Sequence, residues 1–119
     1  MPSKRPRTRF QDIVDNVEAI QRYTNGYDEA KFAADSLTAD AVQYCLLRIS
    51  EAATSLSPDA KALAPQQPWT EISRLGNRLR HEYHMISMKT IWQIIEDDLG
   101  SLKHDWLAAI AMLPEDPPI

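Results

Sequence analysis

Residues 38–56, TADAVQYCLLRISEAATSL, predict a long amphipathic helix near the middle of the chain. Apolar side chains recur there every three or four positions, as they do along one face of an α-helix. This stripe consists of Val42, Cys45, Leu46, Ile49, Ala53 and Leu56. It needs apolar partners from other segments, because each fully buried Leu, Ile or Val stabilises a fold by about 1.5–3 kcal/mol.

Other segments on both sides carry the same helical periodicity. Long helices are expected at residues 10–25, 69–83 and 87–110, and short ones at 28–34 and 57–63. Thr8 and Gln11 stand in capping-box order at the start of the first helix. The last is expected to continue through Gly100 as one helix. No segment has the alternation of a strand. The sequence therefore predicts an all-α fold, an up-and-down four-helix bundle with one or two short extra helices.

Length and composition favour a single, small domain without cross-links. The chain has 119 residues, a formal net charge of −4 and one cysteine, Cys45, which has no partner for an internal disulfide. No run approaches the ~18 apolar residues of a membrane span. There is no broad excess of basic residues of the kind that grips duplex DNA. We expect a cytoplasmic protein that does not enter membranes.

Charge and proline divide the chain into three parts. Residues 1–9 form a basic N-terminal tail, residues 10–113 the helical domain, and residues 114–119 an acidic tail rich in proline. The bland interpretation of the first tail is solvated chain, and the last segment is expected to be disordered.

The helix at residues 69–83 carries an unusual polar face. Arg74, Asn77, Arg78 and His81 follow one another at helical spacing, on the side away from Leu79. Such a face is often only solvated. A histidine beside arginines can also move a proton and stabilise a phosphorane, and metal-independent RNA cleavage needs little more, because the ribose 2′-OH is the nucleophile.

A metal site is a further alternative for the same region. His81 and His84 stand three residues apart, and Glu82 and Glu96 are near in sequence. The spacing does not match an H-E-x-x-H pattern, and no thiolate cluster accompanies it. We therefore predict neither a metal nor another cofactor.

Several short motifs together resemble the HepT-like proteins of the HEPN superfamily. The resemblance covers roughly residues 7–112, and its most specific part is the Asn-x-x-x-His-x-Tyr segment from Asn77 to Tyr83. Supporting motifs are Phe10-Gln11-Asp12-Ile13, Pro68-Trp69-Thr70-Glu71-Ile72, Ile91-Trp92 and Asp98-Leu99.

This resemblance implies a specific biology. Family members are small all-α homodimers in which two R-x(4–6)-H motifs meet and form a metal-independent ribonuclease site. Many are toxins paired with a minimal nucleotidyltransferase antitoxin, which transfers AMP to a tyrosine of the motif. By position, His81 matches the catalytic histidine and Tyr83 the modified tyrosine. Tyr83 is expected to be accessible near the end of its helix.

The chain departs from the family at the arginine of the motif, where it has Gly76. Arg74 satisfies the longer spacing and Arg78 lies on the face of His81, whereas Arg80 points about 100° away and is expected to matter less. Gly76→Arg is expected to raise activity without harming the fold. Two hypotheses follow: a toxin-type ribonuclease, or a catalytically weakened dimeric partner of a minimal nucleotidyltransferase.

Overall fold

The computed structural model describes residues 3–118, and over that range its regular elements are all helices, with no strand. Its long helices are α1 (Pro6–Tyr23), α3 (Ser36–Thr54), α5 (Trp69–His81) and α7 (Leu99–Met112). Shorter ones are α2 (Glu29–Ala34), α4 (Pro58–Lys61), α6 (Met88–Asp97) and a 3-10 turn, η1 (Tyr83–Met85). In this part of the chain, no helix is long and apolar enough to span a membrane.

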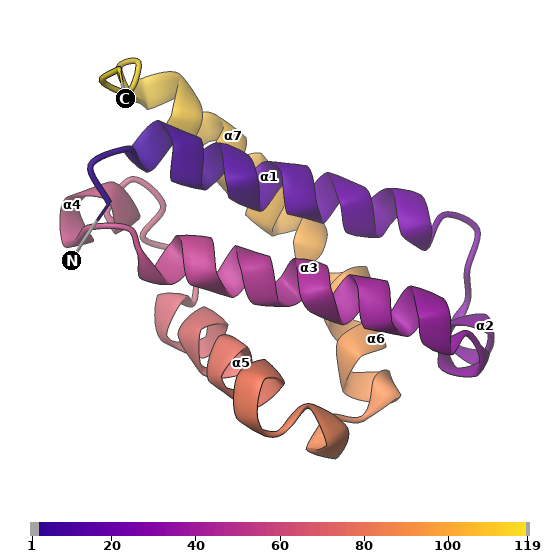
Figure 1. The fold of residues 1–119 in the computed structure, drawn as a ribbon. Helices are drawn as coiled ribbons and strands as arrows, with labels where there is room; N and C mark the ends of the chain where they lie inside the picture. Colours follow the sequence, from indigo (N-terminus) through magenta and orange to yellow (C-terminus); the bar gives the residue numbers. More distant parts are fainter. Residues whose placement is uncertain (1–2, 119) are drawn as a thin grey trace.

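The long helices run alternately up and down, as Figure 1 shows. α3 lies against α1 on one side and α5 on the other, and α7 packs on the far side of α1. The predicted all-α bundle with short extra helices is confirmed. α5 packs mainly on α3, and Figure 1 shows its ribbon diverging from that of α6.

Aromatic side chains hold the two ends of the bundle. Near the chain termini, the Trp69 ring lies 6.5 Å from Phe10 of α1 and 5.8 Å from Trp106 of α7. At the other end, Phe32 of α2 lies 5.5 Å from Trp92 of α6. Buried aromatic pairs of this kind contribute beyond the area that they remove from water.

α1 begins earlier than predicted. Its first residue is Pro6, so Thr8 lies inside the helix and forms no capping box. The carboxylate of Asp116, from the far end of the chain, accepts hydrogen bonds from the backbone N–H groups of Arg7 (3.2 Å) and Thr8 (2.8 Å) and from the Thr8 hydroxyl. The guanidinium of Arg5 donates to the carbonyl of Pro117.

These contacts correct the two predicted tails. Residues 6–9 belong to α1, and the acidic segment packs on the start of α1 over its described residues, 114–118. The free N–H groups of a helix start attract a carboxylate. Here the carboxylate comes from a residue remote in sequence, so no local pattern indicates it. Met1, Pro2 and Ile119 lie outside the described residues.

The prediction of a single helix over residues 87–110 is wrong. This segment is divided at Asp98, where φ is −110°, into α6 and α7. The two halves have different partners, since α6 packs on α2 and α7 on α1. Gly100, in the first turn of α7, favours a break here because glycine costs about 1 kcal/mol in a helix interior.

The contact between α3 and α5 is unusually close at Gly76. The hydroxyl of Ser50, a fully buried residue, donates to the carbonyl of Ile72 at 2.9 Å. A Cβ added at Gly76 would lie 1.9 Å from Oγ and 2.7 Å from Cβ of Ser50. The expectation that Gly76→Arg leaves the fold unharmed is therefore wrong, because any side chain at this position collides with α3.

We expect Gly76→Ala to lower the free energy of unfolding. The cost of overpacking, about 1–3 kcal/mol, exceeds the ~1 kcal/mol that alanine gains in a helix. Gly100→Ala is a matched control, since its Cβ would meet no atom within 4 Å, and it should raise stability. Urea unfolding measures both. Ser50→Gly should rescue Gly76→Ala, and strictly additive single and double variants would contradict the collision.

A second prediction concerns Asp116. Burial raises the pKa of its carboxyl, but hydrogen bonds from Thr8 and Arg7 outweigh this and leave the pKa below its ordinary value. A carboxyl with a lowered folded pKa stabilises the fold above its unfolded pKa, and this contribution disappears as the pH falls through the folded pKa. Asp116→Asn should therefore cost about 0.5–1 kcal/mol at neutral pH, at the low end of capping energies because the site is partly exposed.

The matching measurement is urea unfolding at neutral pH and below about pH 3. The difference between wild type and Asp116→Asn should shrink at the acidic pH. Glu115→Gln, beside it on the same segment, removes a carboxylate that has no hydrogen bond or ion pair among the described residues, and should change little at either pH. Equal effects of the two variants would rule out the contact.

Candidate functional site

The predicted site residues all lie on α5 and the turn that follows it. α5 has a buried side, with Gly76 and Leu79 against α3, and a charged side in solvent. The helix ends at His81, and its last turn holds Arg78, Arg80 and His81. Cations are favourable there, because the C-terminal end of a helix carries a partial negative charge.

Arg74, Asn77, Arg78 and His81 are all exposed, as the polar face predicted. The imidazole of His81 has no hydrogen-bond partner within residues 3–118. Tyr83 begins η1 and is 64% exposed, which makes its phenol accessible to another protein. Its ring stands edge-on to the ring of His84 at 5.6 Å.

The three arginines of α5 have different surroundings. Arg74 forms an ion pair with Glu71 at 2.9 Å on the exposed surface. Arg80 donates to the side-chain oxygen of Asn77 at 2.8 Å and lies 3.6 Å from the carboxylate of Glu51 on α3. Arg78 has neither a hydrogen bond nor an ion pair with any described side chain, so its guanidinium is available to an anion.

The structure thus brings together Asn77 and Arg80, a pair that the helical face did not predict. Their spacing of three residues is visible in the sequence, but Glu51 joins them only through the packing of α3 on α5. Arg80 consequently holds the amide of Asn77 in place, whereas the sequence predicted that Arg80 would matter less than the other arginines.

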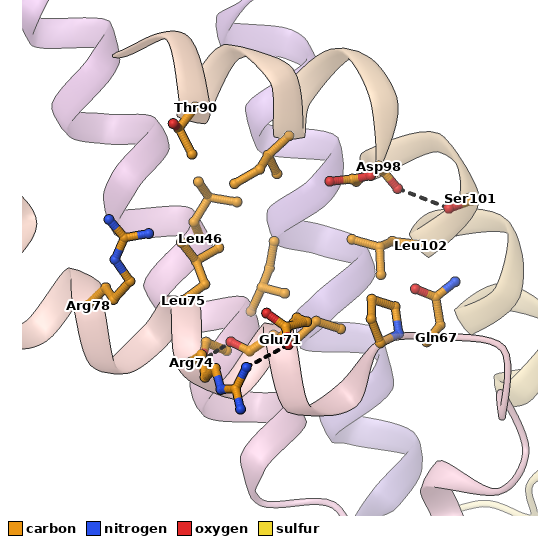
Figure 2. A pocket seen from close by; sticks show the side chains of 15 residues that line it. Leu46, Gln67, Glu71, Arg74, Leu75, Arg78, Thr90, Asp98, Ser101 and Leu102 are labelled. Atoms are coloured by element: carbon orange, nitrogen blue, oxygen red, sulfur yellow. Dashed lines mark hydrogen bonds and ion pairs between the residues drawn. The ribbon is translucent and has the colours of Figure 1, made fainter. Parts of the chain in front are cut away.

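A cleft of about 420 Å³ adjoins this face, between α5 on one side and α6 and α7 on the other (Figure 2). Its floor is aliphatic and comes from α3. Arg74 and Arg78 line the α5 side, and Asp98 the opposite side. Sequence patterns missed this cleft, because it is assembled from four separate helices.

Asp98 differs from the acidic residues around it. Its carboxylate extends into the cleft in Figure 2, and it has no hydrogen-bond donor among the described residues. Burial raises the pKa of its carboxyl, and the neighbouring charge of Asp97 raises it further. An acceptor without a donor, facing an open cleft, is suited to bind N–H groups of a ligand.

The histidines do not form a metal site with acidic neighbours. Within the described range, no group of three or more His, Cys, Asp or Glu side chains gathers closely enough to hold a metal ion. The alternative of a metal centre at His81 and His84 therefore has no geometric support.

Comparison with known proteins identifies the family. The model of the family described as "Ribonuclease HepT-like" matches residues 13–106. The "Probable ribonuclease HepT" of Thermococcus cleftensis is 32% identical over 94 residues, which cover 79% of this chain and 86% of that protein. The chain belongs to the HepT-like ribonuclease family.

Other relatives agree with this assignment. A Methanocaldococcus jannaschii protein, provisionally named an RNase, is 36% identical over 95 residues, covering 80% of this chain and 78% of that protein. A Caldanaerobacter subterraneus protein with a similar provisional name is 26% identical over 100 residues, which cover 84% of this chain and 89% of that protein. No solved structure matches the chain. The HepT-like region contains the whole of α5 and η1, and with them His81 and Tyr83.

Proposed function

We propose that this HepT-like chain is a metal-independent RNA endonuclease and the toxin of a toxin–antitoxin pair. The observation that carries the proposal is the exposed face of α5, where His81 lies three residues after Arg78, whose guanidinium has no partner among the described side chains. Three residues along a helix correspond to about 4.5 Å of rise, so both side chains can reach one phosphodiester.

The chemistry follows from these groups. A neutral His81 takes the proton of a ribose 2′-OH, whose oxygen attacks the adjacent phosphorus. Arg78 stabilises the extra negative charge on the pentacovalent phosphorane, and Arg74 adds to it when Glu71 releases it. The P–O5′ bond then breaks, and a protonated histidine supplies the proton for the leaving oxygen. The products are a 2′,3′-cyclic phosphate and a 5′-hydroxyl.

This mechanism needs one base and one acid. A homodimer in which the α5 faces of two copies meet would supply a histidine for each role. The exposed charged side of α5 is available for such a contact, and we therefore propose that the active form is a dimer.

The test is cleavage of single-stranded RNA at neutral pH with EDTA present, read as cyclic-phosphate ends. His81→Ala should abolish cleavage. Arg78→Ala should lower the rate by about 10²–10³, the usual cost of one lost transition-state contact. Arg74→Ala should cost less, since Glu71 already holds its guanidinium. Arg80→Ala should act only through Asn77 and cost about tenfold or less.

Arg22→Ala, an exposed arginine on α1, is the matched control and should cleave like wild type. Light scattering of the same preparations should give twice the 13.5 kDa chain mass. If neither wild type nor His81→Ala cleaves RNA, the ribonuclease proposal is overturned. A monomer that cleaves RNA would overturn the dimeric site.

The alternative is a catalytically weakened dimer that binds a minimal nucleotidyltransferase. Gly76 favours it, because the arginine of the family motif is absent and the structure leaves no room for a side chain there. In either case the partner enzyme would act on Tyr83, whose phenol is exposed.

We expect Tyr83 to receive one AMP unit when the chain is co-expressed with its nucleotidyltransferase and ATP. Peptide mass spectrometry locates the addition. Tyr44 is an internal control, since it is 60% exposed on α3 but lies outside the motif. Tyr83→Phe should remove the modification. Modification of Tyr44 to the same extent, or none at Tyr83, would contradict the assignment.

A further inference from the structure

The cleft beside α5 is apolar at its floor and charged at its edges. Leu46 and Ile49 of α3 form the floor, Leu75 the α5 side, and Ile94 and Leu102 the opposite side. None of the side chains that line it is aromatic. A concave surface of this composition, with a few polar groups at its rim, is typical of small-ligand sites.

The rim carries charges of opposite sign on opposite sides. Arg78 reaches toward Thr90 across the cleft, and Arg74 lies near its ion-pair partner Glu71 (Figure 2). Asp98 faces them from the junction of α6 and α7. A ligand that satisfies both sides presents an anionic group to Arg78 and N–H donors to Asp98, with a flat or apolar body between them.

The size of the cleft restricts the class of ligand. A volume of about 420 Å³ lies near the lower end of the range for small-ligand sites, ~300–1,000 Å³. A nucleoside fits such a space. The flat faces of purine and pyrimidine rings can also pack on aliphatic side chains such as those of the floor of this cleft.

We propose that this cleft binds one unstacked RNA base, with guanine preferred, while Arg78 holds the adjoining phosphate beside His81. Guanine suits Asp98 because its Watson–Crick edge places an imino and an amino N–H side by side, opposite the two oxygens of a carboxylate. Uracil and cytosine present fewer adjacent donors. The inference rests on the proposed function, to which it adds a base preference next to the cleaved bond.

The test uses guanosine 5′-monophosphate and uridine 5′-monophosphate as probes, with backbone amide NMR of the wild-type protein as the readout. Shifts caused by the guanine nucleotide should fall on residues of the cleft. Ile94→Trp fills the cleft from α6, and it should weaken binding of the guanine nucleotide by about tenfold or more, the usual effect of losing one base contact. Leu107→Trp, at an exposed position of α7, is the matched control and should bind like wild type.

Asp98→Ala separates base preference from filling of the cleft. It should reduce guanine binding to the level of uracil and leave uracil binding unchanged, which a general loss of structure would not do. It also keeps the proposal testable if Ile94→Trp does not fold. Guanine binding that survives Asp98→Ala, or shifts that fall outside the cleft, would overturn the proposal.

Cleavage assays on the same variants separate this inference from the proposed function. RNA cleavage that keeps its rate and base preference in Ile94→Trp would refute the base site and leave the ribonuclease standing. If guanine binds in the cleft but the chain never cleaves RNA, the ribonuclease proposal is refuted and the base site stands. If Ile94→Trp changes the oligomeric mass and no nucleotide binds, the cleft is a protein interface and the proposal is wrong.

Discussion

The close approach of α3 and α5 at Ser50 and Gly76 determines where every charged group of the candidate site lies. With no side chain at position 76, the Ser50 hydroxyl reaches the backbone carbonyl of Ile72. Because α5 is seated this deeply on α3, Leu79 is buried and His81 is turned outward. The same seating keeps α5 away from α6 and leaves the cleft open. Interiors pack without spare volume, so one added methyl group would disturb all of these positions together.

Glycine at this position therefore has a structural explanation independent of catalysis. The family motif has an arginine here, but in this chain the position faces a buried serine of α3. In the proposed ribonuclease, the positive charge would come from elsewhere on the helix. Arg78 is the residue whose surroundings fit this task, since Arg74 and Arg80 are engaged by Glu71, Asn77 and Glu51.

Most of the helices and the polar face of α5 could be predicted from the sequence. Both depend on helical periodicity, which is local, and Ser57 and Ser87, the first residues of two predicted ranges, cap α4 and α6. The division at Asp98 and the early start of α1 were not predictable in this way. Pro6 and Gly100 are local signals for them, but each also depends on a partner far away in the chain: α2 and α1 for the two halves of the last helix, and Asp116 for the first turn.

The same distinction applies to the site. His81, Arg78 and Tyr83 could be selected from spacing and resemblance, because they share one short segment. The pairing of Arg80 with Glu51 and the position of Asp98 at the cleft required the packing of four helices. Sequence reasoning also treated position 76 as a free surface slot, because periodicity gives the direction of a side chain but not the distance to the next helix.

The hydrogen bonds between Asp116 and the start of α1 have a consequence for the order in which the molecule is completed. The ribosome makes α1 before the segment that carries Asp116. During synthesis the first turn of α1 has no carboxylate for its free N–H groups, and Trp106, which packs on Trp69, is also missing. The nascent chain can form α1 and α3, but the bundle closes only after α7 and the Asp116 segment emerge. Completion of the bundle therefore waits for residues 99–116, and a chain cut short before Asp116 leaves the first turn of α1 without its carboxylate.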